Sequence, residues 1–359
     1  MKVVTIIGAR PQFIKAAVVS RALASQREVE EVIVHTGQHF DTNMSEIFFD
    51  EMDIPKPDYN LEIHSLSHGA MTGRMIERVE KILQIESPGA VLVYGDTNST
   101  FAGAIAARKL GIKLLHVEAG LRSFDMVMPE EVNRILTDRI SDVLYCPTDT
   151  AVQNLKREGF GHFGCRIVQS GDVMEDAALF YAKKASAHST IIQDLGLSHS
   201  NFLICTLHRE ENTNDARRLR ELVAGLNELG ETHKIVMPLH PRTKAALIKE
   251  GLDLRVQLIS PVGYFDMIML LKNSSLVITD SGGLQKEAYF FSSSCVTMRD
   301  QTEWTELVKN GFNLLVGANK ERLTDGVRSM LSKPFRRTVE LYGNGKAANI
   351  IAADISACS

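Results

Sequence analysis

Residues 1–15, MKVVTIIGARPQFIK, contain an apolar run that ends in a glycine and is followed at once by a proline-led helical pattern. The run from Val3 to Ile7 is typical of a strand buried on both faces. Pro11 pre-sets the backbone for the first turn of a helix. Such a tight turn points free backbone N–H groups beyond the sheet edge, where Arg10 and Lys15 add two cations. The stretch predicts the start of a parallel sheet with an anion site; an ordinary strand–helix unit with solvated cations is the alternative.

Short apolar runs alternate with helical patterns along most of the chain, as in a doubly wound parallel sheet. The first set of predicted strands is 3–7, 31–35, 90–94, 113–117, 143–146 and 167–169. After a polar stretch near residues 183–201, the second set is 202–206, 234–237, 256–259, 276–279 and 295–297. We therefore expect an α/β protein of two Rossmann-like domains facing each other across a cleft. The expected domains are residues 1–172, with a last helix in 345–359 that packs back on them, and residues 173–344.

Composition excludes several classes of protein. The 359 residues are 44% hydrophobic and 23% charged, with a formal net charge of −4. This balance argues against a general nucleic-acid or membrane surface. No signal peptide or membrane-spanning stretch is expected. The five cysteines are odd in number and scattered, which predicts no disulfide framework, no metal site and a reducing cytoplasm. No GxGxxG follows the first strand, so no dinucleotide cofactor is expected.

Three carboxylates lie where the first domain is expected to open toward a ligand. Asp96 comes after strand 90–94, Glu118 after strand 113–117, and Glu131 at a predicted helix start. Parallel strands end at one edge of a sheet, where ligands bind, so these acids are expected to lie close together. Neighbouring carboxylates push their pKa values apart, as acid–base chemistry requires. Singly, Asp96 is equally typical of a turn acid, Glu118 of a partner of Arg122, and Glu131 of a helix-dipole acid.

Polar groups also follow strands of the second domain. Strand 276–279 leads into DSGG at 280–283, where two glycines give a ligand access to the backbone and Ser281 can cap a helix or donate to a phosphate. Glu287 is placed to accept ribose hydroxyls, or to be a surface acid of the helix. His208 and His240 follow two further strands, where a histidine can relay a proton or bind phosphate. Together with the cations Arg10 and Lys15 of the first domain, this pattern predicts that a nucleotide diphosphate binds between the domains.

Several blocks of the sequence match one known family in order and spacing. They are GARP at 8–11 with Lys15, GQH at 37–39, GDTNST at 95–100, HVEAGLR at 116–122, PEEVNR at 129–134, the block 206–212, SGG at 281–283 with Glu287, and Arg299 with Thr302 and Glu303. In these blocks the chain resembles the non-hydrolysing UDP-N-acetylglucosamine 2-epimerases over essentially its full length.

The resemblance implies a GT-B-like fold that closes on a UDP-sugar, and a homodimer. It also implies that C2 of the sugar is inverted by anti-elimination of UDP to a 2-acetamidoglycal, followed by re-addition of UDP. By motif matching, the implied acid–base set is Asp96, Glu118, Glu131 and His208. The implied UDP- and substrate-binding residues are Arg10, Lys15, His240, Ser281, Gly282, Gly283, Glu287 and Arg299.

The chain departs from the family pattern at three places. The usual Gly-Thr-Arg-Pro-Glu is GARPQ at 8–12, and the Arg-Pro after the Thr-Glu pair is replaced by Trp304-Thr305. These variants resemble the branch that converts UDP-2,3-diacetamido-2,3-dideoxyglucuronate to its mannuronate epimer for surface polysaccharide such as the lipopolysaccharide O-antigen. Losing an acid at Gln12 suits a substrate with an extra carboxylate, because like charges repel; neutral drift away from the sugar is the alternative. The segment 40–43 also differs, so activation by UDP-GlcNAc is not transferred to this chain.

Other functions remain open at this point. Within the family, the alternative is an epimerase of UDP-GlcNAc and UDP-ManNAc, or one that hydrolyses its substrate. A GT-B glycosyltransferase would share the architecture but would not need acids at C2. A non-catalytic UDP-sugar sensor is disfavoured, because carboxylates would repel a dianionic ligand.

Overall fold

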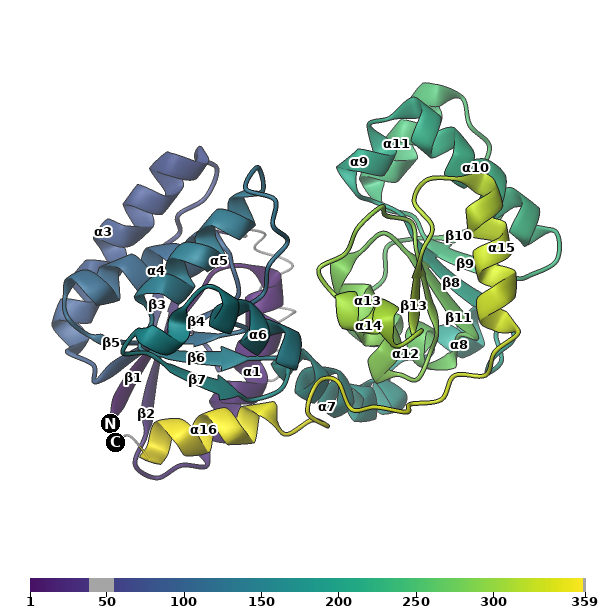
Figure 1. Ribbon diagram of the computed structural model, residues 1–359. Helices are drawn as coiled ribbons and strands as arrows, with labels where there is room; N and C mark the ends of the chain where they lie inside the picture. The colour runs from purple at the N-terminus through teal and green to yellow at the C-terminus, as the bar shows by residue number, and fades with distance from the viewer. Residues whose placement is uncertain (39–54, 358–359) are drawn as a thin grey trace. The chain divides into compact units, whose positions relative to one another are not determined.

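The computed structural model describes residues 1–38 and 55–357, except for the side chain of Arg10. His39 and the segment 40–43 therefore lie outside the described residues. The chain forms two compact units (Figure 1): Met1–Ala177 with Glu340–Ser359, and Ala178–Val339. We call them unit 1 and unit 2.

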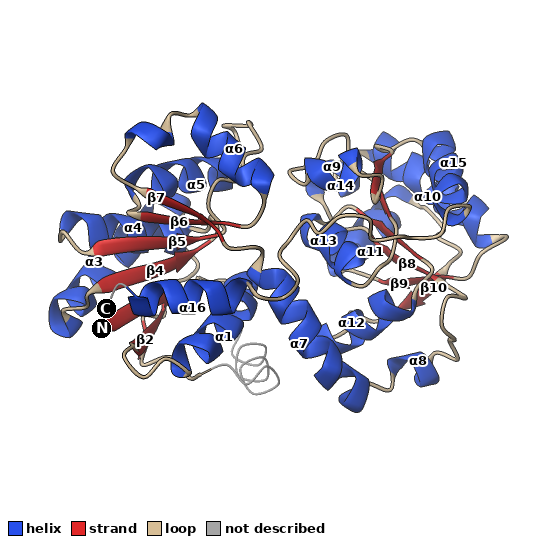
Figure 2. Ribbon diagram, turned by 60° about the horizontal axis from the view of Figure 1, so that its bottom comes forward, coloured by secondary structure: helices blue, strands red, loops and turns tan. Residues whose placement is uncertain are grey.

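Unit 1 is built on a seven-stranded parallel sheet of order β3-β2-β1-β4-β5-β6-β7. Its strands are β1 (Lys2–Ile7), β2 (Glu30–His35), β3 (Tyr59–Asn60), β4 (Ala90–Tyr94), β5 (Lys113–Val117), β6 (Val143–Cys146) and β7 (Arg166–Gln169). Its helices are α1 (Arg10–Ala24), α3 (His68–Glu86), α4 (Asn98–Lys109), α5 (Pro129–Ile140), α6 (Asp149–Arg157), the 3₁₀ turn η1 (Phe160–His162) and α16 (Ala347–Ala357). Helices α3, α4 and α5 pack side by side on one face, and α1 packs with α16 on the other (Figure 2).

Unit 2 is built on a six-stranded parallel sheet of order β10-β9-β8-β11-β12-β13. Its strands are β8 (Leu203–Thr206), β9 (Ile235–Pro238), β10 (Gln257–Ile259), β11 (Leu276–Thr279), β12 (Cys295–Thr297) and β13 (Asn313–Leu315). Its helices are α8 (Ile191–Asp194), α9 (Glu210–Thr213), α10 (Ala216–Gly230), α11 (Pro241–Glu250), α12 (Tyr264–Asn273), α13 (Gly282–Phe290), α14 (Thr305–Lys309) and α15 (Lys320–Leu331). Helix α7 (Val173–His188) runs from unit 1 into unit 2.

The central strands explain why the sequence folds in this way. Every residue of β4 is buried, as a parallel strand covered on both faces requires. Gly8 follows β1 at a point where a Cβ would lie 2.0 Å from Thr36 Oγ1, so a larger residue would not fit. Cys146, Cys205 and Cys295 are buried within the strands and pack as small apolar groups.

The chain order reverses direction between β1 and β4 in unit 1, and between β8 and β11 in unit 2. These are the topological switch points at which α/β sheets bind ligands. The last helix, α16, belongs to unit 1 although it follows unit 2 in the chain. Asp176 accepts hydrogen bonds from Ala347 N (3.1 Å) and Ala348 N (2.7 Å) at the start of this helix.

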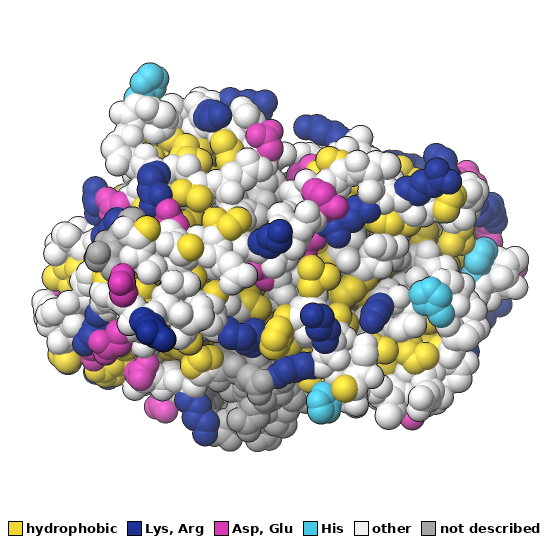
Figure 3. Space-filling view, turned by 90° about the horizontal axis from the view of Figure 1, so that it is seen from below, with side chains coloured by type: hydrophobic (Ala, Val, Ile, Leu, Met, Phe, Trp, Pro, Cys, Tyr) yellow, Lys and Arg dark blue, Asp and Glu magenta, His cyan; other side chains and the backbone are white. Residues whose placement is uncertain are grey.

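Among residues 1–38 and 55–357, each helix is either too short or too polar to cross a bilayer. On the face drawn in Figure 3, basic side chains are scattered among acidic and neutral ones and form no continuous area.

Candidate functional site

The first site lies at the switch point of unit 1, where α1, β4 and β5 bring charged residues together. Lys15 on α1 forms an ion pair with Glu118, which follows β5; both side chains are about nine-tenths buried, with exposed fractions of 11% and 9%. Glu118 has φ +70, a left-handed backbone that non-glycine residues rarely adopt. Gly95 makes room for this pair, because a Cβ there would lie 3.1 Å from Glu118 Oε2.

Asp96 follows β4 and is held by Arg134 from α5. Arg134 Nε donates to Asp96 Oδ2 at 3.0 Å, and Nη2 contacts the same oxygen. Burial raises the pKa of Asp96, and the charge of Glu118 adds to this effect against the opposing charges of Arg134 and Lys15. The side chain keeps 28% of its surface exposed. Asp96 is therefore a carboxyl group that can hold a proton and still reach a ligand.

Glu131 joins the same cluster through Arg134 but lies deeper. Its oxygens accept hydrogen bonds from Ser123 N (2.9 Å), Phe124 N (2.9 Å) and Arg134 Nη1 (2.7 Å). The side chain is fully buried. In this arrangement Glu131 fixes the loop after β5 and the guanidinium that holds Asp96.

Two interpretations of this edge need correction. Glu118 is not the partner of Arg122, because Arg122 binds Asp138 and Glu158 instead. Gln12 does not face a ligand: its side chain is buried, accepts from Gly8 N at 2.9 Å and donates to the Tyr94 carbonyl at 2.9 Å. The idea that Gln12 avoids repelling a substrate carboxylate is therefore wrong. A glutamate could not donate to that carbonyl unless it were protonated.

The second site lies at the switch point of unit 2, around the fully buried Asp280 at the end of β11. Asp280 accepts from the backbone N–H groups of His208 (3.0 Å) and Arg209 (2.8 Å). His208 Nδ1 lies 3.3 Å from Asp280 Oδ1. Burial lowers the pKa of His208, and the nearby cationic groups lower it further. The negative charge of Asp280 acts in the other direction and only partly offsets this shift of the pKa. The ring is thus oriented by a carboxylate and favoured in its neutral form.

The turn after Asp280 exposes backbone at the start of α13. Ser281 is the N-cap residue, but its side chain makes no capping hydrogen bond, unlike the plain cap considered from the sequence. A Cβ on Gly283 would meet only Ser281 Oγ at 4.0 Å, whereas one on Gly282 would lie 2.4 Å from Glu303 Oε1. The space beside Gly283 gives an anion access to the N-terminus of α13.

The other predicted residues of unit 2 surround this turn or lie nearby. Glu287 is buried on α13. Arg299 donates from Nη1 to Glu303 Oε2 at 3.0 Å. His240 caps α11 by accepting from Arg242 N at 3.2 Å, and its ring centre lies 5.5 Å from that of His208. Arg10 lies outside the residues whose side chains are described.

The sequence prediction did not single out Arg134 or Asp280. Both had a signal in the sequence: Arg134 lies one helical turn after Glu131, and Asp280 is the first residue after a strand. Among the described residues, no group of three or more His, Cys, Asp or Glu side chains is arranged to hold a metal ion.

Two parallel α/β sheets, each with polar groups at its switch point, define the GT-B-like class of nucleotide-sugar enzymes. A glycosyltransferase from Rickettsia africae has this fold, with a TM-score of 0.56 and 14% identity over 99% of this chain and 93% of that chain. That likeness concerns the fold alone. The GT-B-like prediction is confirmed.

Closer matches define the family. The family model described as UDP-N-acetylglucosamine 2-epimerase matches residues 21–356. The UDP-2,3-diacetamido-2,3-dideoxy-D-glucuronate 2-epimerase of Pseudomonas aeruginosa is 56% identical over 98% of each chain. The structure of Methanocaldococcus jannaschii UDP-GlcNAc 2-epimerase in complex with UDP-GlcNAc and UDP has a TM-score of 0.88 and 42% identity, and the match covers 99% of this chain and 100% of that one.

The chain therefore belongs to the UDP-N-acetylglucosamine 2-epimerase family. It is a non-hydrolysing UDP-sugar 2-epimerase, as the motifs predict.

Proposed function

We propose that this epimerase acts on UDP-2,3-diacetamido-2,3-dideoxyglucuronate and yields the mannuronate epimer. The observation that carries the proposal is the 56% identity over 98% of each chain to the Pseudomonas aeruginosa enzyme of that name. An epimerase of UDP-GlcNAc is the second candidate, favoured by the 42% identity to the Methanocaldococcus jannaschii enzyme. A homodimer in the cytoplasm that supplies a surface-polysaccharide precursor completes the proposal.

In the proposed reaction, a base removes the C2 proton while the C1–O bond to UDP breaks, which leaves a C1=C2 glycal and UDP. The C2 proton is not acidic by itself, and loss of a stable diphosphate makes its removal feasible. UDP then adds back to C1 as a proton is delivered to the other face of C2. The product therefore has the opposite configuration at C2, and no atom is gained or lost.

This chemistry needs a proton acceptor and a proton donor on opposite faces of the sugar ring. Asp96 suits one of these roles, because its raised pKa favours the protonated form and part of its side chain is exposed. Glu118 suits the other, because it is ion-paired with Lys15. Glu131 is fully buried and acts in this proposal by holding Arg134.

The UDP group is assigned to unit 2 and to the cations that follow β1. Backbone N–H groups at Gly282 and Gly283 stabilise the diphosphate at the N-terminus of α13, and Ser281 donates to it. His208, His240 and Arg299 supply further donors, Glu287 accepts the ribose hydroxyls, and Arg10 and Lys15 stabilise the departing charge.

The test is incubation of the protein with each UDP-sugar in heavy water. We expect deuterium at C2 of both epimers, with UDP retained in the products and a higher kcat/KM for the diacetamido uronate than for UDP-GlcNAc. A higher kcat/KM for UDP-GlcNAc would refute the proposed substrate. Free sugar and UDP as products would instead indicate hydrolysis, and absence of deuterium would refute the elimination mechanism.

A further inference from the structure

A fully buried histidine lies directly beneath the acidic cluster of unit 1. His116 is on β5, next to the strand that leads to Asp96, and its side chain has no exposed surface. Its Nε2 lies 2.8 Å from the carbonyl oxygen of Gly95, and its Nδ1 lies 2.8 Å from Asp138 Oδ1. The histidine thus connects the turn after β4 to helix α5.

The two partners of His116 determine what its ring does. The carbonyl of Gly95 can only accept a hydrogen bond. Burial opposes ionisation of Asp138, but the hydrogen bond and charge of His116, together with Arg122, outweigh it and hold the pKa of Asp138 below its ordinary value. Asp138 is therefore an ionised acceptor. Nε2 of His116 donates to the Gly95 carbonyl, and Nδ1 faces the Asp138 carboxylate in a fully buried contact.

The contact of His116 with the Gly95 carbonyl fixes the peptide group that precedes Asp96. On the other side of Asp96, Asn133 Nδ2 donates to the carbonyl oxygen of Asp96 at 3.0 Å. Arg134 holds the carboxylate itself. Gly95 also has φ +62, a left-handed backbone that glycine adopts without steric cost. Of the peptides on either side of Asp96, one is thus held by His116 and the other by Asn133.

The contact at Asp138 extends to the turn that follows Glu118. Asp138 Oδ2 accepts from Gly120 N at 3.1 Å and from Arg122 Nη1 at 2.7 Å. Arg122 in turn makes two hydrogen bonds of 2.7 Å to Glu158. The His116–Asp138 pair therefore links the turn of Asp96 to the turn of Glu118.

We propose that His116 is a positioning residue of the epimerase, which sets the direction of Asp96 by holding the Gly95 carbonyl through Nε2, while the contact of Nδ1 with Asp138 keeps the ring in place. It does not contact the sugar. Proton transfer to and from opposite faces of one carbon depends on both carboxyl groups being in place, and a misplacement of about 1 Å can cost about 100-fold in rate. The inference rests on the proposed acid–base roles of Asp96 and Glu118.

The test compares two variants, each of which keeps one of the two hydrogen bonds of the His116 ring and loses the other. His116→Gln places an amide N–H group where Nε2 donates to Gly95 and loses the donor to Asp138. His116→Asn places one where Nδ1 donates to Asp138 and leaves the Gly95 carbonyl without its donor. Both remove the ring and one of its two buried hydrogen bonds, so they are matched for the cost of a merely structural defect.

We measure kcat, KM and thermal unfolding for both variants and the wild-type protein. For His116→Asn we expect kcat to fall about 100-fold with KM nearly unchanged, because substrate binding does not depend on the direction of Asp96. For His116→Gln we expect kcat within about tenfold of wild type at a similar unfolding temperature.

Equal losses of kcat in the two variants, or a loss that appears in KM, would overturn the proposal and leave His116 a structural residue. Failure of the proposed function would appear differently. The wild-type protein would then fail to exchange the C2 proton in heavy water, and the positioning role would fall with it.

Discussion

The two units use the same position in the same kind of sheet for different chemistry. At the switch point of unit 1, the functional groups are acidic side chains, Asp96 and Glu118, and a cation holds each of them. At the switch point of unit 2, the carboxylate is buried, and Asp280 uses its oxygens to hold two backbone N–H groups and His208.

The difference teaches where the chemistry of such a sheet is decided. In sheets with this strand order, ligands generally bind at the switch point. The first residues after each strand then determine what the site offers. In unit 1 a strained Glu118 and a Gly95 turn present acids, whereas in unit 2 two glycines present backbone N–H groups.

The largest expected effect is the loss of turnover in Asp96→Asn, which changes the site of unit 1 and leaves that of unit 2 intact. The amide still accepts from Arg134, so the cluster keeps its geometry, but it cannot exchange a proton. We expect turnover to fall about 10³-fold, within the range of general acid–base contributions. UDP affinity, measured by calorimetry, should remain close to that of wild type, because UDP is assigned to groups outside this acid.

The matched control is Asp325→Asn on α15, which is outside the residues assigned to either site and has a side chain that is 77% exposed. It should leave turnover unchanged. Turnover by Asp96→Asn above about a tenth of the wild-type rate would contradict an acid–base role for this residue.

The next effect is from Arg134→Lys. The guanidinium binds Asp96 and Glu131 at once, and a lysine ammonium lacks the planar fork needed for both. We expect kcat to fall about 10- to 100-fold while UDP affinity is retained.

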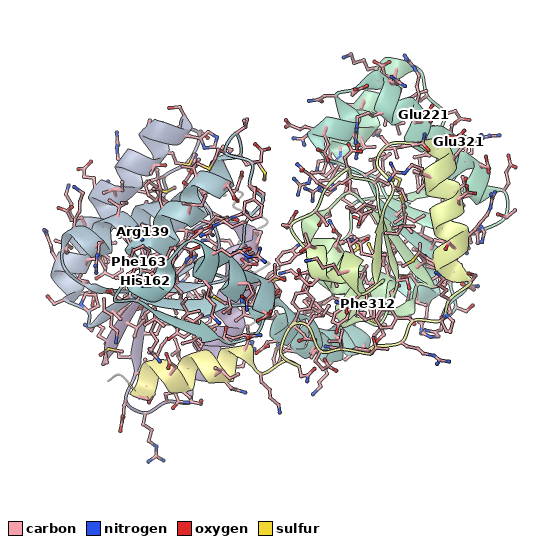
Figure 4. The ribbon with its side chains drawn as sticks, in the orientation of Figure 1. Arg139, His162, Phe163, Glu221, Phe312 and Glu321 are labelled. Carbon is pink, nitrogen blue, oxygen red and sulfur yellow. The ribbon has the colours of Figure 1, made fainter. Side chains whose placement is uncertain are left out.

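Arg139→Lys is the control on the same helix. Figure 4 labels Arg139 and Phe163, and the guanidinium carbon lies 3.4 Å from the centre of the Phe163 ring. This variant replaces the planar guanidinium stacked on the Phe163 ring by an ammonium and should reduce stability slightly, without a change in kcat. If Arg134→Lys and Arg139→Lys lost kcat equally, the contacts of Arg134 with Asp96 and Glu131 would not be what supports turnover.

A smaller effect is expected in unit 2 from Gly283→Ala. A Cβ there would meet only Ser281 Oγ at 4.0 Å, so the unfolding temperature should not fall. The added methyl would lie beside the assigned diphosphate and weaken a charged hydrogen bond, so we expect the Kd for UDP to rise about tenfold or more.

Gly282→Ala is the informative comparison, because its Cβ would lie 2.4 Å from Glu303 Oε1 and should destabilise the protein itself. Unchanged UDP affinity in Gly283→Ala would place the diphosphate elsewhere.

The smallest expected effect is a change in the pH dependence of stability, caused by the partly buried His208 of unit 2. The pKa of His208 is lowered in the folded protein below the ordinary value of 6.5. Its contribution to stability is therefore present above that value and is lost as the pH falls through the folded pKa. From pH 7.5 to about 5, the wild-type unfolding temperature should fall more than that of His208→Gln.

Calorimetric scans at several pH values provide the measurement, with the exposed His162→Gln as the control. Equal pH dependence of wild type and His208→Gln would show that His208 is not desolvated.

The central strands were predictable because burial on both faces requires continuous apolar runs. The predicted strands 90–94, 113–117, 143–146, 276–279 and 295–297 agree with the structure. Strands β3 and β13 were missed, because they have only two and three residues and carry no distinct pattern. Helix α15 was also missed, although Leu323, Val327 and Met330 repeat at helical spacing. The polar stretch near 183–201 is partly helical, because α7 continues to His188.

The site was predictable as a set of positions but not as a set of contacts. The positions after strands gave Asp96, Glu118 and His208, since the edge of a parallel sheet gathers such residues. Which cation pairs with which acid depends on side chains distant in sequence: Lys15 and Glu118 are 103 residues apart. Gln12 illustrates the limit, because a departure from the family pattern suggested a substrate contact and the side chain instead supports a buried turn.

The placement of α16 in unit 1 has a consequence for how the protein is made. Unit 1 is discontinuous, and its last segment follows residue 339. During synthesis, the whole of unit 2 leaves the ribosome before α16 is available to cover α1. Unit 2 is thus the first part that has all of its residues available to complete its core, and unit 1 must wait for α16 before α1 is covered.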